Sequence, residues 1–325
     1  MKILITGSAG FVGFHSALRL LGLGHEIIGI DNLNDYYDVG LKHARLAQLE
    51  GKPGFSFIKL DLADREGIAN LFGEHAFDLV LHLGAQAGVR YSLENPFAYL
   101  DSNLAGTLTV LEGCRHNGVK HLIYASSSSV YGSNTKLPFA LEDRVDTPIS
   151  LYAATKKADE LMCHTYAHLY RFPITGLRFF TVYGPLGRPD MAYFKFANAI
   201  TAGKPIDVYN NGDMKRDFTY IDDIVDGIEA IVTKGPVENG SEVPHRVYNL
   251  GHNHPEQLLD MIELLEKELG KEAQKNFLPM QPGDVYATYA DIEAIHRDYG
   301  FVPKVSLADG LRRFSMWYKS FYLNR

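Results

Sequence analysis

A glycine-rich turn directly follows the first apolar run, and this feature limits the possible folds of the chain more than any other. Residues 3–5 are Ile-Leu-Ile, and Gly7, Gly10 and Gly13 follow at three-residue spacing. Such glycines permit a tight turn, close approach of the backbone to a pyrophosphate, and close packing of a helix on a strand. The N-terminus of the next helix would offer free N–H groups to the anion. The order strand, turn, helix therefore indicates a dinucleotide site, with these predicted contacts: Gly7, Gly10, Phe11, Val12 and Gly13.

The first half of the chain alternates short apolar runs with segments of helical periodicity. The runs that predict buried strands are residues 3–5, 26–30, 55–60, 79–83, 122–124 and 174–180. The intervening segments that predict helices are residues 11–21, 41–49, 68–72, 104–114 and 153–169. Strands that are apolar throughout and alternate with helices are typical of a parallel sheet covered on both faces. We therefore expect an α/β fold with a Rossmann-type doubly wound parallel sheet.

The pattern loosens after residue 184, which suggests a second, smaller lobe. Loops rich in Gly, Asn and Asp appear there, and two further helices are predicted at residues 258–269 and 307–322. We assign residues 1–183 to the dinucleotide-binding domain, with return segments near residues 217–251. Two segments, 184–216 and 252–325, are assigned mainly to a substrate-binding lobe at the C-terminal side.

Asp31 closes the second predicted strand, 24 residues after Gly7. A carboxylate in this place accepts hydrogen bonds from ribose hydroxyls and repels the additional phosphate of NADP, so NAD is the predicted cofactor. The alternative is an Asp that only starts a turn. Asn32, Asp61 and Leu62 are further candidates for cofactor contacts. For Asp61, a capping role for the helix that follows is an equally good explanation.

Tyr152 and Lys156 are candidate catalytic residues, because a spacing of four residues on a helix puts two side chains on the same face. The phenol of a tyrosine ordinarily has a pKa of about 10, so it is a poor base at neutral pH. A neighbouring ammonium group and a positive nicotinamide ring would favour the phenolate, which could then accept a proton from a sugar hydroxyl. The alternative is a surface lysine beside a core tyrosine.

Four serines, residues 126–129, follow the fifth predicted strand. Ligands bind at the carboxyl ends of parallel strands, so a serine hydroxyl there can bond the reacting oxygen. A polar loop without a catalytic role is the alternative.

The overall composition narrows the class of protein. The formal net charge of −7 argues against general nucleic-acid binding. Neither the two cysteines, Cys114 and Cys163, nor the thirteen histidines form a metal-binding pattern, so no metal is expected. We see no signal peptide and no apolar segment long enough to span a membrane, which favours a cytoplasmic enzyme without a membrane partner.

Together, the glycine turn, Ser127, Tyr152 and Lys156 resemble the extended short-chain dehydrogenases. This NAD-dependent epimerase/dehydratase family includes UDP-galactose 4-epimerases, nucleotide-sugar 4,6-dehydratases and UDP-glucuronate decarboxylases. The resemblance runs from Met1 to about residue 314. It implies that Ser127 is the catalytic hydroxyl, that Tyr152 and Lys156 act with it, and that the substrate is a UDP-sugar.

The residues after Ser127 favour epimerisation within this family. Dehydratases carry an Asp-Glu pair after the catalytic hydroxyl, and decarboxylases usually have a Glu just before Val-Tyr-Gly. Here those places hold Ser128 and Ser129. A hydroxyl is an inefficient general acid or base at neutral pH without strong activation.

Residues 178–191 resemble the signature of UDP-glucuronate 4-epimerases, as do residues 34–37, 87–92 and 214–220. The resemblance implies that Thr181 and Arg188 hold the sugar carboxylate and that Arg90 and Arg216 lie on the diphosphate and uridine side. Guanidinium groups suit both anions because they donate in a bidentate fork. For Arg188, a solvated loop cation is the alternative. Gln281 stands where related enzymes often have Arg, and Asp284 is a candidate acceptor for a ribose hydroxyl.

The resulting hypothesis is inversion of carbon 4 of a UDP-uronic acid, UDP-glucuronate to UDP-galacturonate, through a transient 4-keto sugar. Alternatives within the fold are a UDP-glucuronate decarboxylase and a 4-epimerase of another UDP-hexose or an N-acetylated UDP-sugar. A nucleotide sensor without activity is a further alternative, but it would be expected to lose Tyr152 or Lys156. Apolar faces near residues 104–114 and 156–169 could pair in a homodimer, although burial within one chain explains the same pattern.

Overall fold

Seven parallel strands form the central sheet of the computed structural model, which describes residues 1–237, 240, 242–280 and 286–323. The strand order is β10-β6-β5-β4-β1-β2-β3. The strands of this sheet are β1 (Lys2–Thr6), β2 (Glu26–Asp31), β3 (Phe55–Lys59), β4 (Leu79–His82), β5 (His121–Ser127), β6 (Ile174–Phe179) and β10 (His245–Leu250). The order reverses between β1 and β4, as expected for a doubly wound sheet, so the predicted fold class is confirmed.

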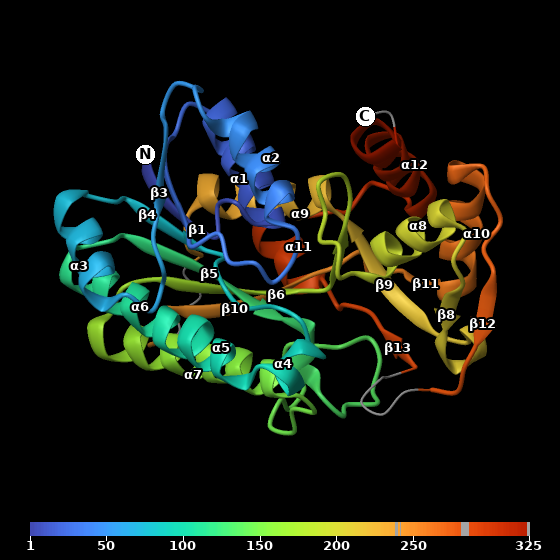
Figure 1. The fold of residues 1–325 in the computed structure, drawn as a ribbon. Helices are drawn as coiled ribbons and strands as arrows, with labels where there is room; N and C mark the ends of the chain where they lie inside the picture. Colours follow the sequence, from blue (N-terminus) through green and yellow to red (C-terminus); the bar gives the residue numbers. More distant parts are fainter. Residues whose placement is uncertain (238–239, 241, 281–285, 324–325) are drawn as a thin grey trace.

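Helices cover both faces of this sheet (Figure 1). Alternate side chains of a strand point to opposite faces. Accordingly, Ile3 and Ile5 pack with Phe14 on one face, whereas Leu4 packs with Phe72 on the other. The first face carries α1 (Phe11–Gly22), α2 (Val39–Leu49), α9 (Ile221–Lys234) and α11 (Glu293–Tyr299). The second carries α3 (Arg65–Glu74), α4 (Tyr91–Glu94), α5 (Pro96–Tyr99), the π-helical turn η1 (Leu100–Ala105), α6 (Gly106–His116) and α7 (Leu151–Tyr170).

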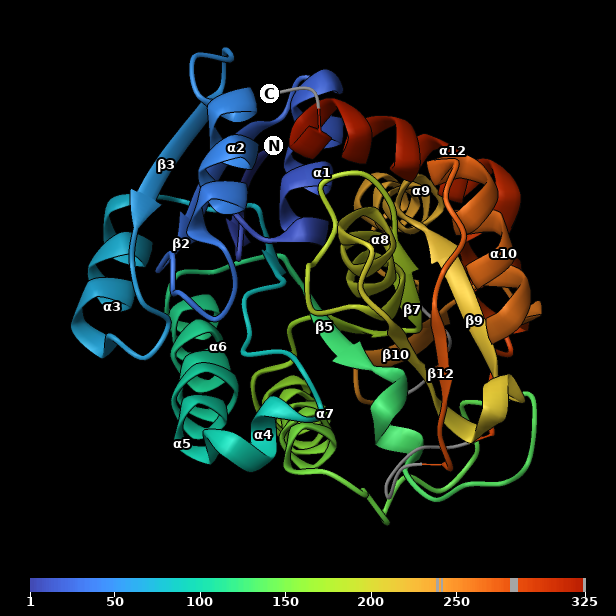
Figure 2. The same cartoon turned by 45° about the vertical axis from the view of Figure 1, so that its right-hand side comes forward.

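A smaller assembly of short strands and helices lies beside the carboxyl end of the sheet (Figure 2). Four strands pair here: β7 (Thr181–Tyr183), β9 (Lys215–Tyr220), β11 (Pro255–Gln257) and β13 (Ala287–Thr288). A separate pair consists of β8 (Ile206–Val208) and β12 (Lys275–Phe277). Their apolar core is shared with α8 (Ala192–Ala202), α10 (Leu258–Leu269) and α12 (Leu307–Tyr318). The sequence predicted α10 and α12 in full, the latter with four further residues at its C-terminal end, but not α8 or the short strands.

The remaining elements are short helical turns, namely η2 (Ser128–Tyr131), η3 (Tyr209–Gly212) and η4 (Lys319–Leu323). In the part of the chain described by the structure, none of the helices has the length and apolar character required to cross a membrane.

A buried ion pair joins α7 to the strands that lead into the site. Arg178 of β6 donates from Nε to Glu160 Oε1 at 2.7 Å and from Nη2 to Oε2 at 2.9 Å. Ser126 of β5 donates to the same carboxylate at 2.7 Å, and Arg178 also donates to the Tyr131 hydroxyl at 3.0 Å. Burial opposes ionisation of Glu160, but the hydrogen bonds and charge of Arg178 outweigh burial and lower the pKa of the carboxyl. The pair fixes one turn of α7 relative to the ends of β5 and β6.

We predict that Arg178→Met lowers the free energy of unfolding by about 3 to 5 kcal/mol near neutral pH, because a buried carboxylate loses its partner. The pKa of Glu160 is lowered in the folded protein, so the wild type gains stability from this group above its ordinary pKa and loses it as pH falls through the lowered value. In the variant, protonation of Glu160 relieves the unpaired charge. The deficit in a urea titration should therefore shrink as pH falls from about 7 to about 5.

The matched control is Arg144→Met, since the Arg144–Asp146 pair is exposed and should contribute at most about 1 kcal/mol. A deficit for Arg178→Met no larger than that of the control, or one that grows on acidification, would contradict this interpretation.

Candidate active site

One cavity of about 970 Å³ lies at the carboxyl ends of the parallel strands and reaches into the smaller assembly. Every described residue that the sequence analysis named as a site residue lines it: Gly7, Gly10, Phe11, Val12, Gly13, Asp31, Asn32, Asp61, Leu62, Arg90, Ser127, Ser128, Tyr152, Lys156, Thr181, Arg188 and Arg216. Gln281 and Asp284 lie outside the described residues. The size suits a small-molecule ligand or cofactor.

The glycine turn forms a cradle of backbone with no room for side chains. A Cβ atom on Gly13 would lie 2.1 Å from the carbonyl oxygen of Gly7, and one on Gly10 would lie 2.8 Å from the same atom. Gly7 has φ of +69°, and its Cβ would lie 2.8 Å from the Cα atom of Gly84, just beyond β4. The start of α1 opens directly onto this cradle. The arrangement fits the pyrophosphate of a dinucleotide.

Polar side chains follow β2 and β3 next to the cradle. Asp31 accepts a hydrogen bond from the backbone N–H of Leu33 at 2.8 Å, and Asn32 donates to Asp61 Oδ2 at 2.8 Å. Asp64, not Asp61, accepts the capping bond of α3, from the N–H of Gly67. The carboxylates of Asp31 and Asp61 both line the cavity, where they could accept bonds from an adenosine moiety.

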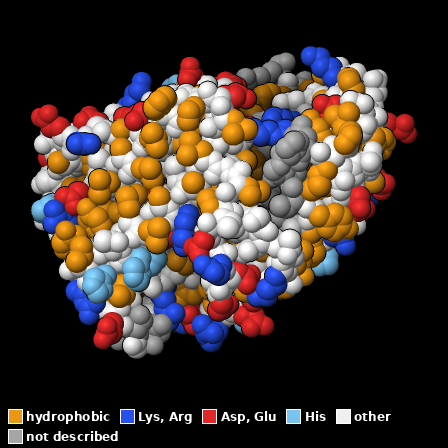
Figure 3. Space-filling model, turned by 90° about the horizontal axis from the view of Figure 1, so that it is seen from below, with side chains coloured by type: hydrophobic (Ala, Val, Ile, Leu, Met, Phe, Trp, Pro, Cys, Tyr) orange, Lys and Arg blue, Asp and Glu red, His pale blue; other side chains and the backbone are white. Residues whose placement is uncertain are grey.

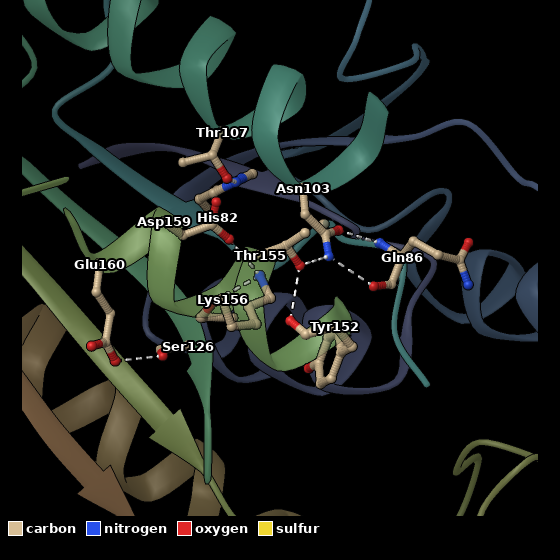
Figure 4. Close-up of polar contacts among 12 residues, drawn as sticks. His82, Gln86, Asn103, Thr107, Ser126, Tyr152, Thr155, Lys156, Asp159 and Glu160 are labelled. Carbon is tan, nitrogen blue, oxygen red and sulfur yellow. Dashed lines mark hydrogen bonds and ion pairs between the residues drawn. The ribbon is translucent and has the colours of Figure 1, made fainter. Parts of the chain in front are cut away.

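Tyr152 and Lys156 lie one turn apart on α7 (Figure 4). Ser127 is the last residue of β5. Lys156 is buried and its Nζ donates to the carbonyl oxygen of Ala125 and to Asp159 Oδ2, both at 3.0 Å. Burial opposes the charge of Lys156, but Asp159 and the phenol of Tyr152 outweigh burial and raise the pKa of the ammonium group. The lysine is therefore a cation at neutral pH, one helical turn from Tyr152. The Ser127 hydroxyl donates to Ser129 Oγ at 3.1 Å.

A second buried network holds α7 at Thr155, next to Lys156 (Figure 4). Asn103 lies within the π-helical turn η1, and its Nδ2 donates to the Thr155 hydroxyl at 3.0 Å and to the carbonyl oxygen of Gln86 at 3.1 Å. The N–H of Gln86 donates back to Asn103 Oδ1 at 2.8 Å. Buried polar networks of this kind are rigid when all partners are satisfied. This one holds Thr155, whose hydroxyl donates to the backbone carbonyl oxygen of Tyr152 at 2.9 Å, against η1.

The loop between β7 and α8 brings Arg188 into the cavity. Arg45 of α2 is fully buried and donates to the carbonyl oxygen of Leu186 at 2.8 and 3.0 Å and to that of Gly187 at 3.1 Å. It also donates to the carbonyl oxygen of Ala9, in the glycine turn, at 2.8 Å. A single guanidinium group therefore ties the loop that carries Arg188 to the glycine turn.

His15 adds a bond from α1 to the same loop. Its Nε2 donates to the carbonyl oxygen of Pro185 at 3.0 Å. Burial lowers the pKa of His15 to about 4, so the imidazole is neutral at neutral pH and adds no further charge beside Arg45.

Two arginines line the far end of the cavity, where a nucleotide could bind. Arg90 lies over the ring of Tyr209 with 5.4 Å between the guanidinium carbon and the ring centroid. Arg216 of β9 donates to the carbonyl oxygens of Lys215 at 2.8 Å and Tyr286 at 3.2 Å. Both residues are positioned by the smaller assembly and can face an anion in the cavity.

Sequence reasoning missed several groups that build the site. Lys42 lines the cavity 3.5 Å from Asp31 Oδ1, and Arg45 holds the Arg188 loop. The sequence did contain a signal for a buried role of Lys42 and Arg45. Both lie among the apolar positions Leu41, Leu46 and Leu49 of the amphipathic helix α2. A buried cation on the apolar face of a helix needs a partner. Tyr36 and Asp190 lie in two segments, residues 34–37 and 178–191, that resemble UDP-glucuronate 4-epimerases, but no individual role was predicted for either residue.

The arrangement combines a glycine turn that fits a pyrophosphate, two carboxylates that could accept bonds from ribose hydroxyls, and the Ser127 hydroxyl, Tyr152 phenol and Lys156 ammonium group. Such a constellation can hold a dinucleotide against an alcohol and move a proton to or from the alcohol oxygen. Among the described residues, no cluster of three or more His, Cys, Asp or Glu side chains could hold a metal ion.

The chain is similar over nearly its whole length to several known proteins. It is 59% identical to a 37.6 kDa protein of Escherichia coli O111:H-, over 99% of each chain. It is 48% identical to a probable UDP-glucuronate 4-epimerase of Rhizobium meliloti, over 99% of this chain and 98% of the relative. Among solved structures, UDP-glucuronic acid 4-epimerase from Bacillus cereus in complex with UDP-glucuronic acid and NAD matches with a TM-score of 0.90 and 37% identity. That match covers 99% of this chain and 100% of the other.

A sequence model of the NAD dependent epimerase/dehydratase family matches residues 3–251, which include the glycine turn, Ser127, Tyr152 and Lys156. The resemblance stated from the motifs is thereby confirmed, and NAD is the cofactor of this family. The chain belongs to the NAD dependent epimerase/dehydratase family.

Proposed function

We propose that the protein inverts carbon 4 of a UDP-uronic acid and converts UDP-glucuronate to UDP-galacturonate, with NAD as cofactor. The observation that carries the proposal is the position of Arg188, which lines the same cavity as Tyr152 and Lys156. Burial opposes the charge of Arg188, but Asp190 outweighs burial and, together with the Tyr152 phenol, raises its pKa. A permanent cation therefore acts at the reacting end, where a sugar carboxylate would need one. The names of the Rhizobium and Bacillus relatives support the same reaction.

The proposed binding mode follows from the two ends of the cavity. The glycine turn, Asp31, Asn32, Asp61 and Leu62 would hold NAD, which supplies the acceptor and donor of a hydride when bound. Arg90 and Arg216 would hold the diphosphate and uridine of the substrate. In this binding mode the sugar ring would lie between Ser127 and Arg188, with Ser128 and Thr181 beside it, and all four residues line the cavity.

In the proposed reaction, Tyr152 accepts the proton of the 4-hydroxyl, with Ser127 bonded to the same oxygen, while carbon 4 becomes a ketone. Lys156 stabilises the phenolate through its charge. The keto sugar then turns about its phosphate linkage and presents its opposite face. Tyr152 returns the proton to the oxygen, and the configuration at carbon 4 is inverted.

The intermediate carries a particular hazard, because a 4-keto uronic acid is a β-keto acid and loses carbon dioxide easily. The carboxylate must therefore be restrained while the sugar turns. Thr181 at the start of β7 and Arg188 in the next loop are the proposed restraints. The β7 strand is fixed by its pairing with β9, where Thr181 lies opposite Phe218.

We predict that Tyr152→Phe lowers kcat by about 100- to 10,000-fold, because the base is removed while the ring remains. The variant should also lose the rise at the absorbance band of reduced dinucleotide when UDP-glucuronate is added. Tyr166→Phe is the matched control, since Tyr166 lies on the same helix, does not line the cavity and bonds to Glu112. A normal rise in Tyr152→Phe would exclude its role as base.

We predict that Arg188→Ala lowers kcat/KM for UDP-glucuronate by about 10- to 100-fold, the effect of one or two charge-assisted hydrogen bonds. The unrestrained keto intermediate should also release a larger share of UDP-pentose, which product NMR would detect. A panel of UDP-sugars in the same assay separates the epimerase from a decarboxylase or an epimerase of neutral or N-acetylated sugars. Unchanged turnover of UDP-glucuronate in the variant would remove Arg188 from the assignment.

We also propose that the protein is a homodimer that pairs through the helices on the second face of the sheet. Exposed hydrophobic side chains gather there, on the left of Figure 3, below α5 and α7 in Figure 1. They are Leu93, Phe97, Leu100, Leu108, Leu161 and Leu169. Apolar patches of this kind on helices are typical of protein–protein interfaces.

The expected effect of Leu161→Glu, or of Leu108→Glu, is a shift from the mass of two chains to that of one in light scattering after gel filtration, because a charge would be buried in the interface. Val302→Glu is the control, as Val302 is an exposed hydrophobic residue following α11, which lies on the other face of the sheet. Dimers in both helix variants would contradict the proposed interface.

Two further assignments from the sequence stay proposals. The first is the division into a dinucleotide-binding domain, residues 1–183 with return segments near 217–251, and a substrate-binding lobe. The second is a location in the cytoplasm.

A further inference from the structure

Arg188 is not isolated in the cavity, because Asp190 holds it through a bidentate ion pair. Arg188 Nε donates to Asp190 Oδ1 at 3.0 Å and Nη2 donates to Oδ2 at 2.5 Å. The two side chains are only 25% and 19% exposed. A guanidinium group has five N–H donors in a fixed plane, so this lateral bond uses two of them. The remaining donors of the guanidinium group can bond further acceptors such as the neighbouring Tyr36 hydroxyl and, because Arg188 lines the cavity, a second carboxylate bound there.

The carboxylate of Asp190 is itself held by a residue from the cofactor side. The Tyr36 hydroxyl donates to Asp190 Oδ2 at 3.1 Å. Burial and the neighbouring carboxylate raise the pKa of Tyr36 to about 12, so the hydroxyl keeps its proton and remains a donor. Burial opposes ionisation of Asp190, but the charge of Arg188 outweighs burial and lowers the pKa of the carboxyl.

Tyr36 has little freedom to move. Its ring packs on Tyr91 with 4.6 Å between the centroids, and its hydroxyl lies so close to Gly88 that a Cβ atom there would come within 2.4 Å of it. The neighbouring Tyr37 accepts a bond from Arg45 at 2.7 Å. Tyr36, which follows Asp31 and Asn32 on the cofactor side, is therefore a fixed hydrogen-bond partner of Asp190.

We propose that Asp190, anchored by Tyr36, is a positioning residue that holds Arg188 by its Nε and Nη2 edge and leaves the Nη1 and Nη2 end of the guanidinium group to the carboxylate of the sugar. Asp190 thereby sets the preference for a uronate over a neutral sugar. The inference rests on the proposed function and goes beyond it, because it assigns the orientation of the specificity-determining cation to a second carboxylate and to a tyrosine of the cofactor half.

A competing role for Asp190 predicts the opposite change in the affinity for a uronate when its charge is removed. If Asp190 merely occupied Arg188 until a substrate displaced it, removal of its charge would free the guanidinium group and tighten uronate binding. Under the proposed role, removal leaves a long side chain to sample other rotamers, and the entropy of ordering it again weakens uronate binding.

The test compares dissociation constants for UDP-glucuronate and UDP-glucose, measured by calorimetry on the NAD-loaded protein. For Asp190→Asn we expect affinity for UDP-glucuronate to fall about tenfold, the effect of one charge-assisted hydrogen bond, with affinity for UDP-glucose unchanged. Tyr36→Phe should shift the same ratio in the same direction by a smaller factor, and it tests the inference even if Asp190→Asn does not fold. In an Arg188→Ala background, Asp190→Asn should have no further effect, since it acts through that arginine.

The chain offers a matched control in Asp146→Asn. Arg144 and Asp146 have the same spacing, and Arg144 donates to the Asp146 carboxylate from Nε at 3.2 Å and Nη2 at 3.1 Å, but this pair is exposed and outside the cavity. An unchanged or higher preference for UDP-glucuronate in Asp190→Asn and Tyr36→Phe would overturn the inference. A wild-type protein that binds both sugars equally and does not epimerise UDP-glucuronate would contradict the proposed function itself.

Discussion

The buried guanidinium group of Arg45 is the contact on which the geometry of the site depends. It bonds the glycine turn through Ala9 and the Arg188 loop through Leu186 and Gly187. With no carboxylate among these acceptors, its charge is compensated by carbonyl dipoles and the Tyr37 hydroxyl, which is tolerable only when several bonds are made at once. One side chain therefore ties the glycine turn and the loop that carries Arg188 into a single cavity.

Buried charge pairs extend this rigidity to the reacting end. Two successive carboxylates of α7, Asp159 and Glu160, bond Lys156 and Arg178, respectively. Breaking either pair would leave an unpaired charge in the interior, so each holds α7 in one position relative to β5 and β6. Proton transfer needs donor and acceptor within hydrogen-bond reach. These pairs hold the helix that carries Tyr152, one of them through Lys156, which itself lines the cavity.

Local patterns made the first half of the fold and most of the candidate site predictable. Strand ends in a parallel sheet meet at one edge, so Gly7, Asp31 and Ser127 could be placed together from sequence alone. The contacts of Arg45 could not, because its partner Leu186 is 141 residues away and is a backbone carbonyl with no sequence signal. Strands such as β8 and β12 have three residues each, too few for a periodic pattern. The pairing of Arg188 with Asp190 depends on side-chain rotamers, which residue types do not determine.

The central claim is that hydrogen leaves carbon 4 of a UDP-uronate and returns to the same carbon from the opposite face. Incubation of the NAD-loaded protein with UDP-glucuronate that carries deuterium at carbon 4, followed by NMR of the product, tests this claim most directly. The account predicts UDP-galacturonate with the deuterium still at carbon 4. Loss of the label to water during inversion, or recovery of UDP-glucuronate with its stereochemistry unchanged, would contradict it.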